Sequence, residues 1–242
     1  MKRILMLLAI ISLVQIGSFG QKKYEMVIEK TDGTETVINV EDILRTYFRE
    51  KDDGYTTCPD GNHPHMIDLG LPSGTKWACC NVGASAPEEY GNYYAWGEIQ
   101  PKNVYNRDTY QYYQNGNYVN IGSDIAGTQY DAATANWGAP WRMPSLTQIN
   151  ELLNNCTSTW TTQNGVNGRK FTGPNGGTIF LPAAGSRWFS DLSSAGSYGY
   201  YWSSALYESN PYCAYLLVFY SDNAHWNYKY DRFNGHSVRP VR

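Results

Sequence analysis

The sequence predicts an α+β fold, in which one or two helices accompany short, loop-linked antiparallel strands. Short strand-like runs recur from residue 66 to the end, and 23 glycines are spread along the 242-residue chain. Only one segment has clear helical periodicity. Short strands joined by glycine turns, with few helices, are typical of α+β domains. The expected strands are 66–69, 75–79, 93–96, 178–181, 200–204 and 214–219.

The one clear helix is expected to begin just after Ser145. Gln148 stands three residues further on, so the two side chains can form a capping box, and Pro144 ends the preceding segment. Apolar residues then follow at helical spacing, which predicts one buried face. These residues are Leu146, Ile149, Leu152 and Leu153.

Residues 1–20 predict export. Lys2 and Arg3 precede an apolar stretch, and small residues follow it, which is the layout of a cleaved secretory signal. The stretch is too short for a stable membrane anchor. We therefore expect a secreted or cell-surface protein with no transmembrane segment after signal cleavage.

The segment after the signal is expected to form a β-hairpin. Strands are expected over 24–30 and 35–40, with Gly33 in the turn between them, and 42–48 fits either a short helix or a third strand. The expected organisation is a signal peptide at 1–20, a small β-hairpin module at 21–50, a linker at 51–63 and one main domain at 64–242.

The mature chain is expected to be acidic and rich in aromatic residues. Loss of Lys2 and Arg3 leaves 17 basic against 22 acidic residues, a net charge of −5. No basic cluster attracts a phosphate backbone, so we expect no nucleic-acid partner. The 21 tyrosines and 8 tryptophans instead supply large amphipathic contact area, as binding surfaces do.

Five cysteines in an exported chain predict disulfide bonds with one cysteine left over. We expect a bond between Cys80 and Cys156 and another between Cys58 and Cys79, because adjacent cysteines seldom bond to each other. Cys213 would be left over, and whether it is a free thiol stays open. The sequence contains neither zinc-type cysteine pairs nor an Asp-x-Asp-x-Asp calcium loop, so it indicates no metal or cofactor site.

Six sequence blocks together resemble a known family. They are His65–Ala84, Tyr90–Glu98, Trp141–Ser145, Phe180–Gly185, Tyr201–Ser204 and Ser237–Val241. In this order they resemble the Fibrobacter succinogenes major paralogous domain family of exported bacterial proteins, over about residues 64–242.

This resemblance implies a C-type lectin-like fold, closer to the variant found in formylglycine-generating enzymes. Arg142–Ser145 looks like the helix entry of that variant, and Gly235–Arg239 looks like its closing strand. Such domains also resemble the variable proteins of diversity-generating retroelements. In those proteins C-terminal codons are varied so that one face of the domain binds new ligands.

A polar and aromatic region near the C-terminus carries the predicted binding surface. If 214–220 is a strand with alternating faces, Leu216, Val218 and Tyr220 share one face with the polar residues that follow. Most of these positions hold residue types that an Asn codon reaches through adenine changes alone, and the mix suits an adaptable binding surface. The predicted ligand-binding residues are Tyr207, Glu208, Asn210, Tyr212, Leu216, Val218, Tyr220, Asp222, Asn223, His225, Asn227, Tyr228, Lys229 and Tyr230.

Most tryptophans are expected in the core rather than on a carbohydrate platform, because a loop-rich domain needs large apolar groups to bury area. Trp226 lies among the binding positions and is expected to be a fixed scaffold residue. The expected core tryptophans are Trp77, Trp96, Trp141, Trp188 and Trp202.

Catalysis is not expected. The cysteine pair of formylglycine-generating enzymes is absent, and a thiol enzyme built on Cys213 would need His225 or His236 as its base. Glu98 fits a loop anchor or a salt bridge to Arg142 as well as a catalytic role. The carboxylates that a glycosidase reaction would draw on are Asp68, Glu88, Glu89 and Glu98.

We therefore predict an exported, non-enzymatic protein that binds an unknown protein or glycan. One alternative is a structural or adhesive subunit of an extracellular assembly. A diverged thiol enzyme is the other.

Overall fold

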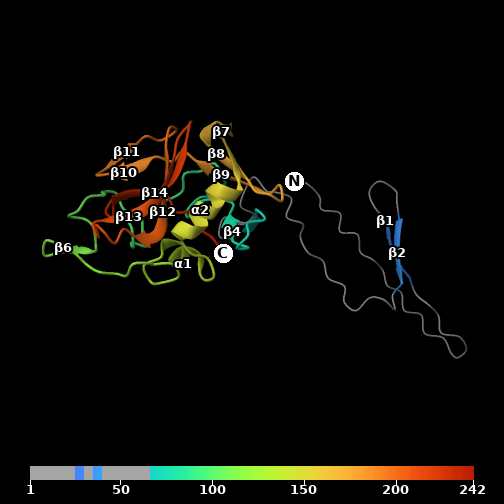
Figure 1. Ribbon diagram of the computed structural model, residues 1–242, viewed down its shortest axis with the longest axis horizontal. Helices are drawn as coiled ribbons and strands as arrows, with labels where there is room; N and C mark the ends of the chain where they lie inside the picture. The colour runs from blue at the N-terminus through green and yellow to red at the C-terminus, as the bar shows by residue number, and fades with distance from the viewer. Residues whose placement is uncertain (1–24, 30–34, 40–65) are drawn as a thin grey trace, which may run out of the picture. The chain divides into compact units, whose positions relative to one another are not determined.

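The computed structural model describes residues 25–29, 35–39 and 66–242, in two units that divide the chain into Met1–Lys51 and Asp52–Arg242. In the first unit, β1 (Glu25–Glu29) pairs antiparallel with β2 (Glu35–Asn39), as expected for a hairpin (Figure 1). The signal, the hairpin turn, segment 42–48 and the linker lie outside the described residues.

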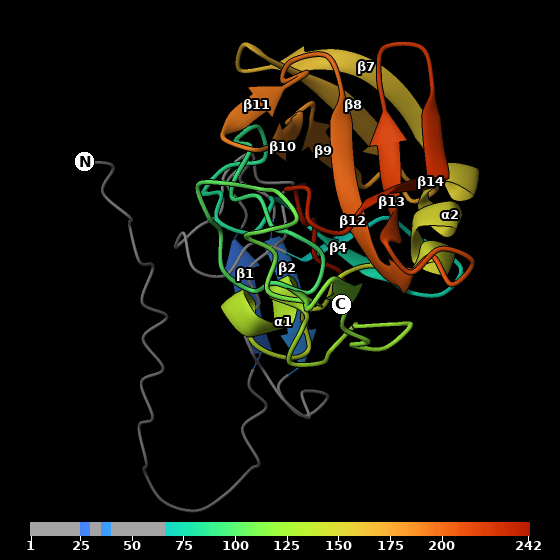
Figure 2. The ribbon, with the colours of Figure 1, turned by 90° about the vertical axis from the view of Figure 1, so that its left-hand side faces the viewer.

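The described part of the second unit, residues 66–242, consists of small antiparallel sheets and two helices, which confirms the α+β class (Figures 1 and 2). Two of its sheets have three strands, in the orders β7-β8-β9 and β12-β13-β14, and the other sheets are two-stranded. The elements are β3 (Met66–Asp68), β4 (Lys76–Ala78), β5 (Tyr113–Gln114), β6 (Asn117–Tyr118), α1 (Ala132–Trp137), α2 (Leu146–Asn155), β7 (Thr157–Gln163), β8 (Val166–Thr172), β9 (Thr178–Pro182), β10 (Ser186–Trp188), β11 (Asp191–Ser193), β12 (Gly199–Leu206), β13 (Cys213–Phe219) and β14 (Ala224–Asp231).

The strand expected at 93–96 is wrong. Tyr94 makes a single antiparallel bridge to His236, and the ladder goes no further. Instead, the amide of Trp96 donates to the carbonyl of Arg232, 2.8 Å away. The backbone of this segment therefore makes separate hydrogen bonds to residues near the C-terminus, and it does not form a continuous strand pairing.

Both helices begin at a side chain that caps their first amides. Ser145 and Gln148 form the predicted capping box at the start of α2, and Ile149 faces the core. Helix α1, whose cap is the buried Asp131, is not among the elements predicted from the sequence. The Asp131 carboxylate accepts from the amides of Ala133 and Met143 at 2.8 and 2.9 Å. Asp131 thus ties α1 to the segment that leads into α2.

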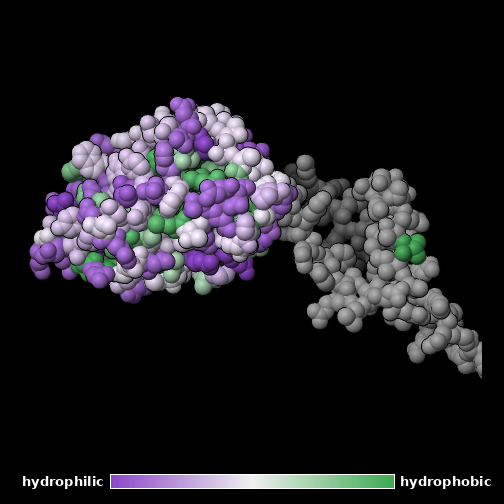
Figure 3. Space-filling view, viewed as in Figure 1, coloured by the Kyte–Doolittle hydropathy of each residue, from purple (hydrophilic) through white to green (hydrophobic). Residues whose placement is uncertain are grey.

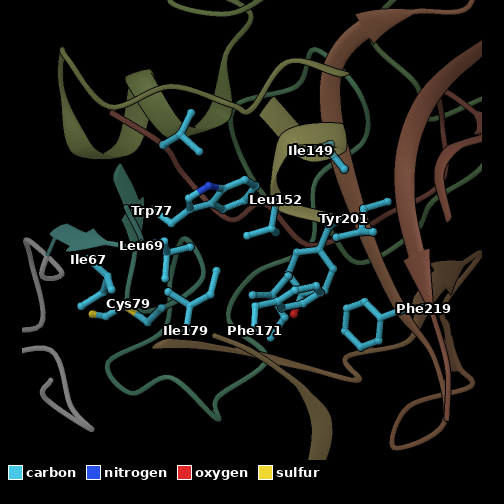
Figure 4. Packing of buried hydrophobic residues seen from close by; sticks show 14 of the residues in the cluster. Ile67, Leu69, Trp77, Cys79, Ile149, Leu152, Phe171, Ile179, Tyr201 and Phe219 are labelled. Atoms are coloured by element: carbon cyan, nitrogen blue, oxygen red, sulfur yellow. The ribbon is translucent and has the colours of Figure 1, made fainter. Parts of the chain in front are cut away.

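The core contains most of the aromatic residues expected there. Trp77, Trp96, Trp141 and Trp202 are buried, so the core prediction is confirmed for these four. Trp226 is half-buried and packs against the largest cluster. In that cluster, residues of α2 meet aromatic residues of β8, β12 and β13 (Figure 4). The labelled examples are Ile149 and Leu152 from α2, Phe171 from β8, Tyr201 from β12 and Phe219 from β13.

A buried arginine fastens the chain end to the start of the unit. Arg239 donates to the carbonyls of Ala78, Cys79 and Phe180 and to the side chain of Asn81, at 2.7 to 3.0 Å. A buried guanidinium is tolerated when its donors are satisfied in this way. Arg239 therefore joins three of the sequence blocks in one hydrogen-bond network.

The predicted Cys80–Cys156 bond is wrong. Cys80 is disulfide-bonded, whereas Cys156 is a free thiol at the C-cap of α2. The spacing of cysteines in the sequence does not show where the end of α2 packs. In the structure, Cys156 at this end packs against the largest core cluster. Cys213 is also a free thiol, and the expected Cys58–Cys79 bond involves a residue outside the described ones.

Candidate ligand-binding surface

The sheet β12-β13-β14 positions the candidate site (Figure 2). Its middle strand, β13, is covered on both faces. Leu217 and Phe219 pack in the cluster that contains α2, whereas Leu216 and Val218 pack in a second cluster with Trp202.

Two predicted binding residues are therefore wrong. Leu216 and Val218 are only 0% and 4% exposed, so neither can contact a ligand in this fold. Their neighbours in sequence, Leu217 and Phe219, are also buried. A strand that is buried on both faces has a continuous run of apolar residues. The alternation of side chains along such a strand does not show which face is exposed.

A contiguous aromatic surface remains on one face of the sheet, and we call it the tyrosine surface. Tyr198 lies 5.9 Å from Tyr200 and 5.3 Å from Tyr220 between ring centroids. Tyr200 in turn lies 5.9 Å from Tyr230, and Tyr220 lies 6.1 Å from His225. Tyr228, half exposed, stands close enough to Tyr200 to influence its ionisation. The tyrosine surface comprises Tyr198, Tyr200, Tyr220, His225, Tyr228 and Tyr230.

A buried histidine supports this surface from below. The His236 ring stacks on Tyr200 with centroids 5.4 Å apart and meets Tyr230 edge-on at 5.1 Å. Its other contact is Trp202, at 4.4 Å. Complete burial lowers the pKa of His236 to about 3, so the imidazole is neutral at physiological pH and acts as a packing residue.

The hydroxyls of Tyr200 and Tyr230 are also neutral at physiological pH. Desolvation, followed by the neighbouring phenols, raises the pKa of Tyr200 to about 12. Desolvation likewise raises the pKa of Tyr230. Neutral phenols both donate and accept hydrogen bonds, so the surface combines ring contacts with adaptable polar contacts.

The turn between β13 and β14 is held by an arginine from another sheet. Arg169 of β8 donates to the carbonyls of Tyr220 and Ser221 at 3.0 and 3.1 Å, and to the hydroxyl of Ser158 at 2.9 Å. It is almost fully buried. This clamp fixes the position of Tyr220 and of the exposed Asp222 and Asn223 that follow it.

The other predicted residues lie away from the tyrosine surface. Lys229 pairs with Tyr215, so it points to the opposite face of the sheet from Tyr228. There its ammonium group stands 4.9 Å from the ring centroid of Tyr207. Tyr212 stacks on the ring of Tyr118, with centroids 4.9 Å apart. Glu208 and Asn210 are exposed between these two groups, and Asn227 is exposed beside the irregularity in the β13–β14 register.

Tyr198 and Tyr200 are not among the binding residues predicted from the sequence. A signal was present, because Tyr198, Tyr200 and Trp202 alternate with smaller or differently placed residues at a period of two. This alternation places all three on one face of β12. Trp202 is buried, whereas Tyr198 reaches solvent.

The site offers no activated nucleophile. The Cys213 thiol lies 3.7 Å from the carboxylate of Asp231, and burial together with this charge raises its pKa to about 11. Such a thiol stays protonated at neutral pH and reacts slowly. His225, which would serve as its base, belongs to the opposite face of the sheet.

The carboxylates considered for a glycosidase are held by structural contacts. Glu98 pairs with Lys102 at 2.7 Å, not with Arg142, and it also accepts from the amide of Gln111. Asp68 pairs with Lys76. Glu88 accepts from side chains of the β7–β8 turn, and Glu89 from Ser85. Within the described ranges, no three metal-ligating side chains gather in one place.

Neither the hydropathy of the surface nor the search for similar known proteins identifies a ligand for this site. The face of the main unit in Figure 3 is mostly hydrophilic or intermediate, with hydrophobic residues in separate areas. In the part of the chain that the structure describes, no helix has the length and apolar character needed to cross a membrane. Neither a protein-family model nor a curated protein nor a solved structure matches the chain.

Proposed function

We propose that this chain is an exported, non-enzymatic ligand-binding protein that uses the tyrosine surface to bind a protein or glycan on a C-type lectin-like scaffold. The observation that carries the proposal is the contiguous group of partly exposed tyrosines on one face of β12-β13-β14. Tyrosines give broad contact area for a small loss of side-chain entropy, and exposed groups of them tend to mark contact sites.

The support beneath these tyrosines favours binding over a passive surface. His236 packs under Tyr200, and Arg169 fixes the turn that carries Tyr220. A surface held in position before the ligand arrives loses little freedom on binding. The tyrosine surface is held in position in this way both at Tyr200 and at Tyr220.

The C-type lectin-like scaffold and the variable character rest on the sequence resemblance. The helix entry at Arg142–Ser145 and the α+β organisation are compatible with such a scaffold. Tyr220, Asn223, His225, Tyr228 and Tyr230 are all residue types that adenine changes produce from an Asn codon. A near-copy of the last hundred or so bases, differing at adenines beside a reverse transcriptase gene, would support adenine-directed variation.

The binding proposal is tested with a triple variant in which Tyr198, Tyr220 and Tyr228 become Ala. Purified chain is screened on a glycan array and an array of bacterial and host surface proteins, and the affinity for each hit is measured. We expect the triple variant to bind at least about 30-fold more weakly, since buried aromatic contacts dominate interface energies. The matched control changes Tyr207 and Tyr212, which lie outside the tyrosine surface, and should keep wild-type affinity.

Two outcomes would contradict the proposal. One is that every hit binds the triple variant as well as it binds the wild type. The other is that the chain has no hits but associates with itself in a tyrosine-dependent way, which would favour the structural or adhesive alternative.

A further inference from the structure

A second aromatic group lies at the tip of the β10–β11 hairpin, at the periphery of the unit (Figures 1 and 2). Trp188 is 55% exposed and Phe189 46% exposed, so the expectation that Trp188 belongs to the core is wrong. The two rings meet nearly perpendicular, with centroids 4.9 Å apart. A perpendicular contact covers at most one face of the indole, so ring surface remains open to a ligand.

The backbone at this tip is strained. Phe189 has a φ of +50° and is the first of the two residues that link β10 to β11, whereas Ser190 has no positive φ. This is the pattern of a type II′ turn, whose first position normally holds glycine. A half-exposed phenylalanine recovers little of the cost through burial. Strain of this kind persists mainly where the residue serves a function.

The strained tip is nevertheless held firmly. Phe189 exchanges two backbone hydrogen bonds of 2.8 Å with Tyr105, which is buried. Arg187 exchanges two more with Gly235, at 2.8 and 2.9 Å, and its guanidinium donates to the carbonyl of Ser190. The aromatic pair is thus positioned before any ligand binds, which reduces the entropy cost of binding.

Polar groups accompany the rings. Asp191 pairs with Trp188 in the hairpin register, so both side chains project from the same face. Asp191 is exposed and makes no ion pair, since the salt bridges among the described residues are Lys76–Asp68 and Lys102–Glu98. The carboxylate accepts one long hydrogen bond, of 3.5 Å, from the Ser190 hydroxyl and has the capacity to accept more. An open indole face beside this carboxylate combines apolar contact with hydrogen-bond acceptance.

We propose that Trp188, Phe189 and Asp191 form a carbohydrate platform, separate from the tyrosine surface, for a chain of β-linked hexopyranoses with equatorial substituents. Such sugars present axial C–H groups on both ring faces and hydroxyls at the rim. The C–H face packs on Trp188, and a rim hydroxyl donates to Asp191. An axial hydroxyl would interrupt the apolar face.

The competing occupants fit less well. Protein interfaces of standard size bury about 800 Å² on each partner, far more than the few exposed side chains at this tip offer. A lipid surface would have to accommodate the carboxylate of Asp191 beside the inserted ring, at a desolvation cost. A sugar satisfies the ring and the carboxylate together.

The test is isothermal titration of the full chain with cellohexaose and chitohexaose, and the comparator is a β-1,4-galactan hexasaccharide, whose 4-oxygens are axial. We expect binding of at least one of the first two probes and weaker binding of the galactan. Trp188→Ala should weaken binding about 30-fold and Trp188→Phe less, because loss of a central aromatic contact costs most. Asp191→Ala should weaken it about fivefold, the effect of one lost hydrogen bond. The triple tyrosine variant should bind these sugars like the wild type, so the two proposals fail independently.

The proposal is overturned if the wild type binds none of the oligosaccharides at millimolar concentration, or if Trp188→Ala binds them unchanged while its circular dichroism spectrum shows a folded domain. Co-sedimentation with phosphatidylcholine vesicles, or dimerisation, that depends on Trp188 in the absence of sugar binding would assign the tip to another occupant and would equally overturn it.

Discussion

The tyrosine surface and the β10–β11 tip both display aromatic residues, but the fold supports them differently. Under the tyrosine surface lie the buried residues of β13 and the His236 ring. At the tip, Trp188 ends β10 and Phe189 begins the link to β11; backbone hydrogen bonds hold Phe189, and the two rings contact each other. Exposed aromatic residues can therefore lie on the outer part of a packed sheet or on a strained turn. The two differ in how substitution affects stability.

The largest effect is expected directly beneath the tyrosine surface. Leu216→Ala removes a fully buried side chain from a strand packed on both faces, and we expect a loss of about 2–5 kcal/mol in unfolding free energy. Trp188→Ala, at the tip, should change it by less than about 0.5 kcal/mol. Urea unfolding of both variants measures the difference. Similar losses in the two variants would remove the distinction between the regions.

His236 should make stability depend on pH. Its pKa of about 3 in the folded chain lies below the ordinary value of 6.5, so between these pH values the unfolded chain binds more protons. Stability therefore falls as pH drops from about 6.5 towards 3, by about 2 kcal/mol at pH 5. His236→Phe should remove this contribution, whereas His225→Phe, at the surface, should keep it. Urea titrations at pH 7 and pH 5 measure it, and an unchanged slope in His236→Phe would contradict burial of a neutral ring.

Arg169 should influence the tyrosine surface through the turn between β13 and β14. Arg169→Met removes its hydrogen bonds to Tyr220, Ser221 and Ser158. We expect the unfolding free energy to fall by about 1–3 kcal/mol and a ligand to bind more weakly at the tyrosine surface. Lys170→Met, an exposed neighbour on the same strand, is the control. Hydrogen exchange of the 220–223 amides should rise only in the Arg169 variant. If both variants behave alike, Arg169 does not hold the turn.

The smallest effect is expected at the strained turn, and it has the opposite sign. Phe189→Gly removes the strain that the positive φ causes, and it should raise the unfolding free energy by up to about 1 kcal/mol. It also removes one ring from the proposed carbohydrate platform. Thermal unfolding measures the gain. Asn164→Gly, at another positive φ, is the comparison, because asparagine tolerates this conformation and little should change. A destabilised Phe189→Gly would show that the ring contributes to the fold.

The features that depend on neighbouring residues could be predicted from the sequence. The capping box of Ser145 and Gln148 placed α2, the β1–β2 hairpin followed from local strand and turn residues, and large apolar size placed Trp77, Trp96, Trp141 and Trp202 in the core. Each of these features depends on interactions between residues close in sequence, or on the burial of large apolar side chains.

Which distant segments meet depends on tertiary packing and could not be predicted from the sequence. This packing covered both faces of β13, so that Leu216 and Val218 left the predicted site. It brought Tyr200 of β12 beside Tyr230 of β14, and Tyr198 beside Tyr220. It also left Cys156 unbonded and exposed Trp188 on a turn. Alternation along a strand assigns residues to two faces, but which face is covered depends on segments far away in the chain.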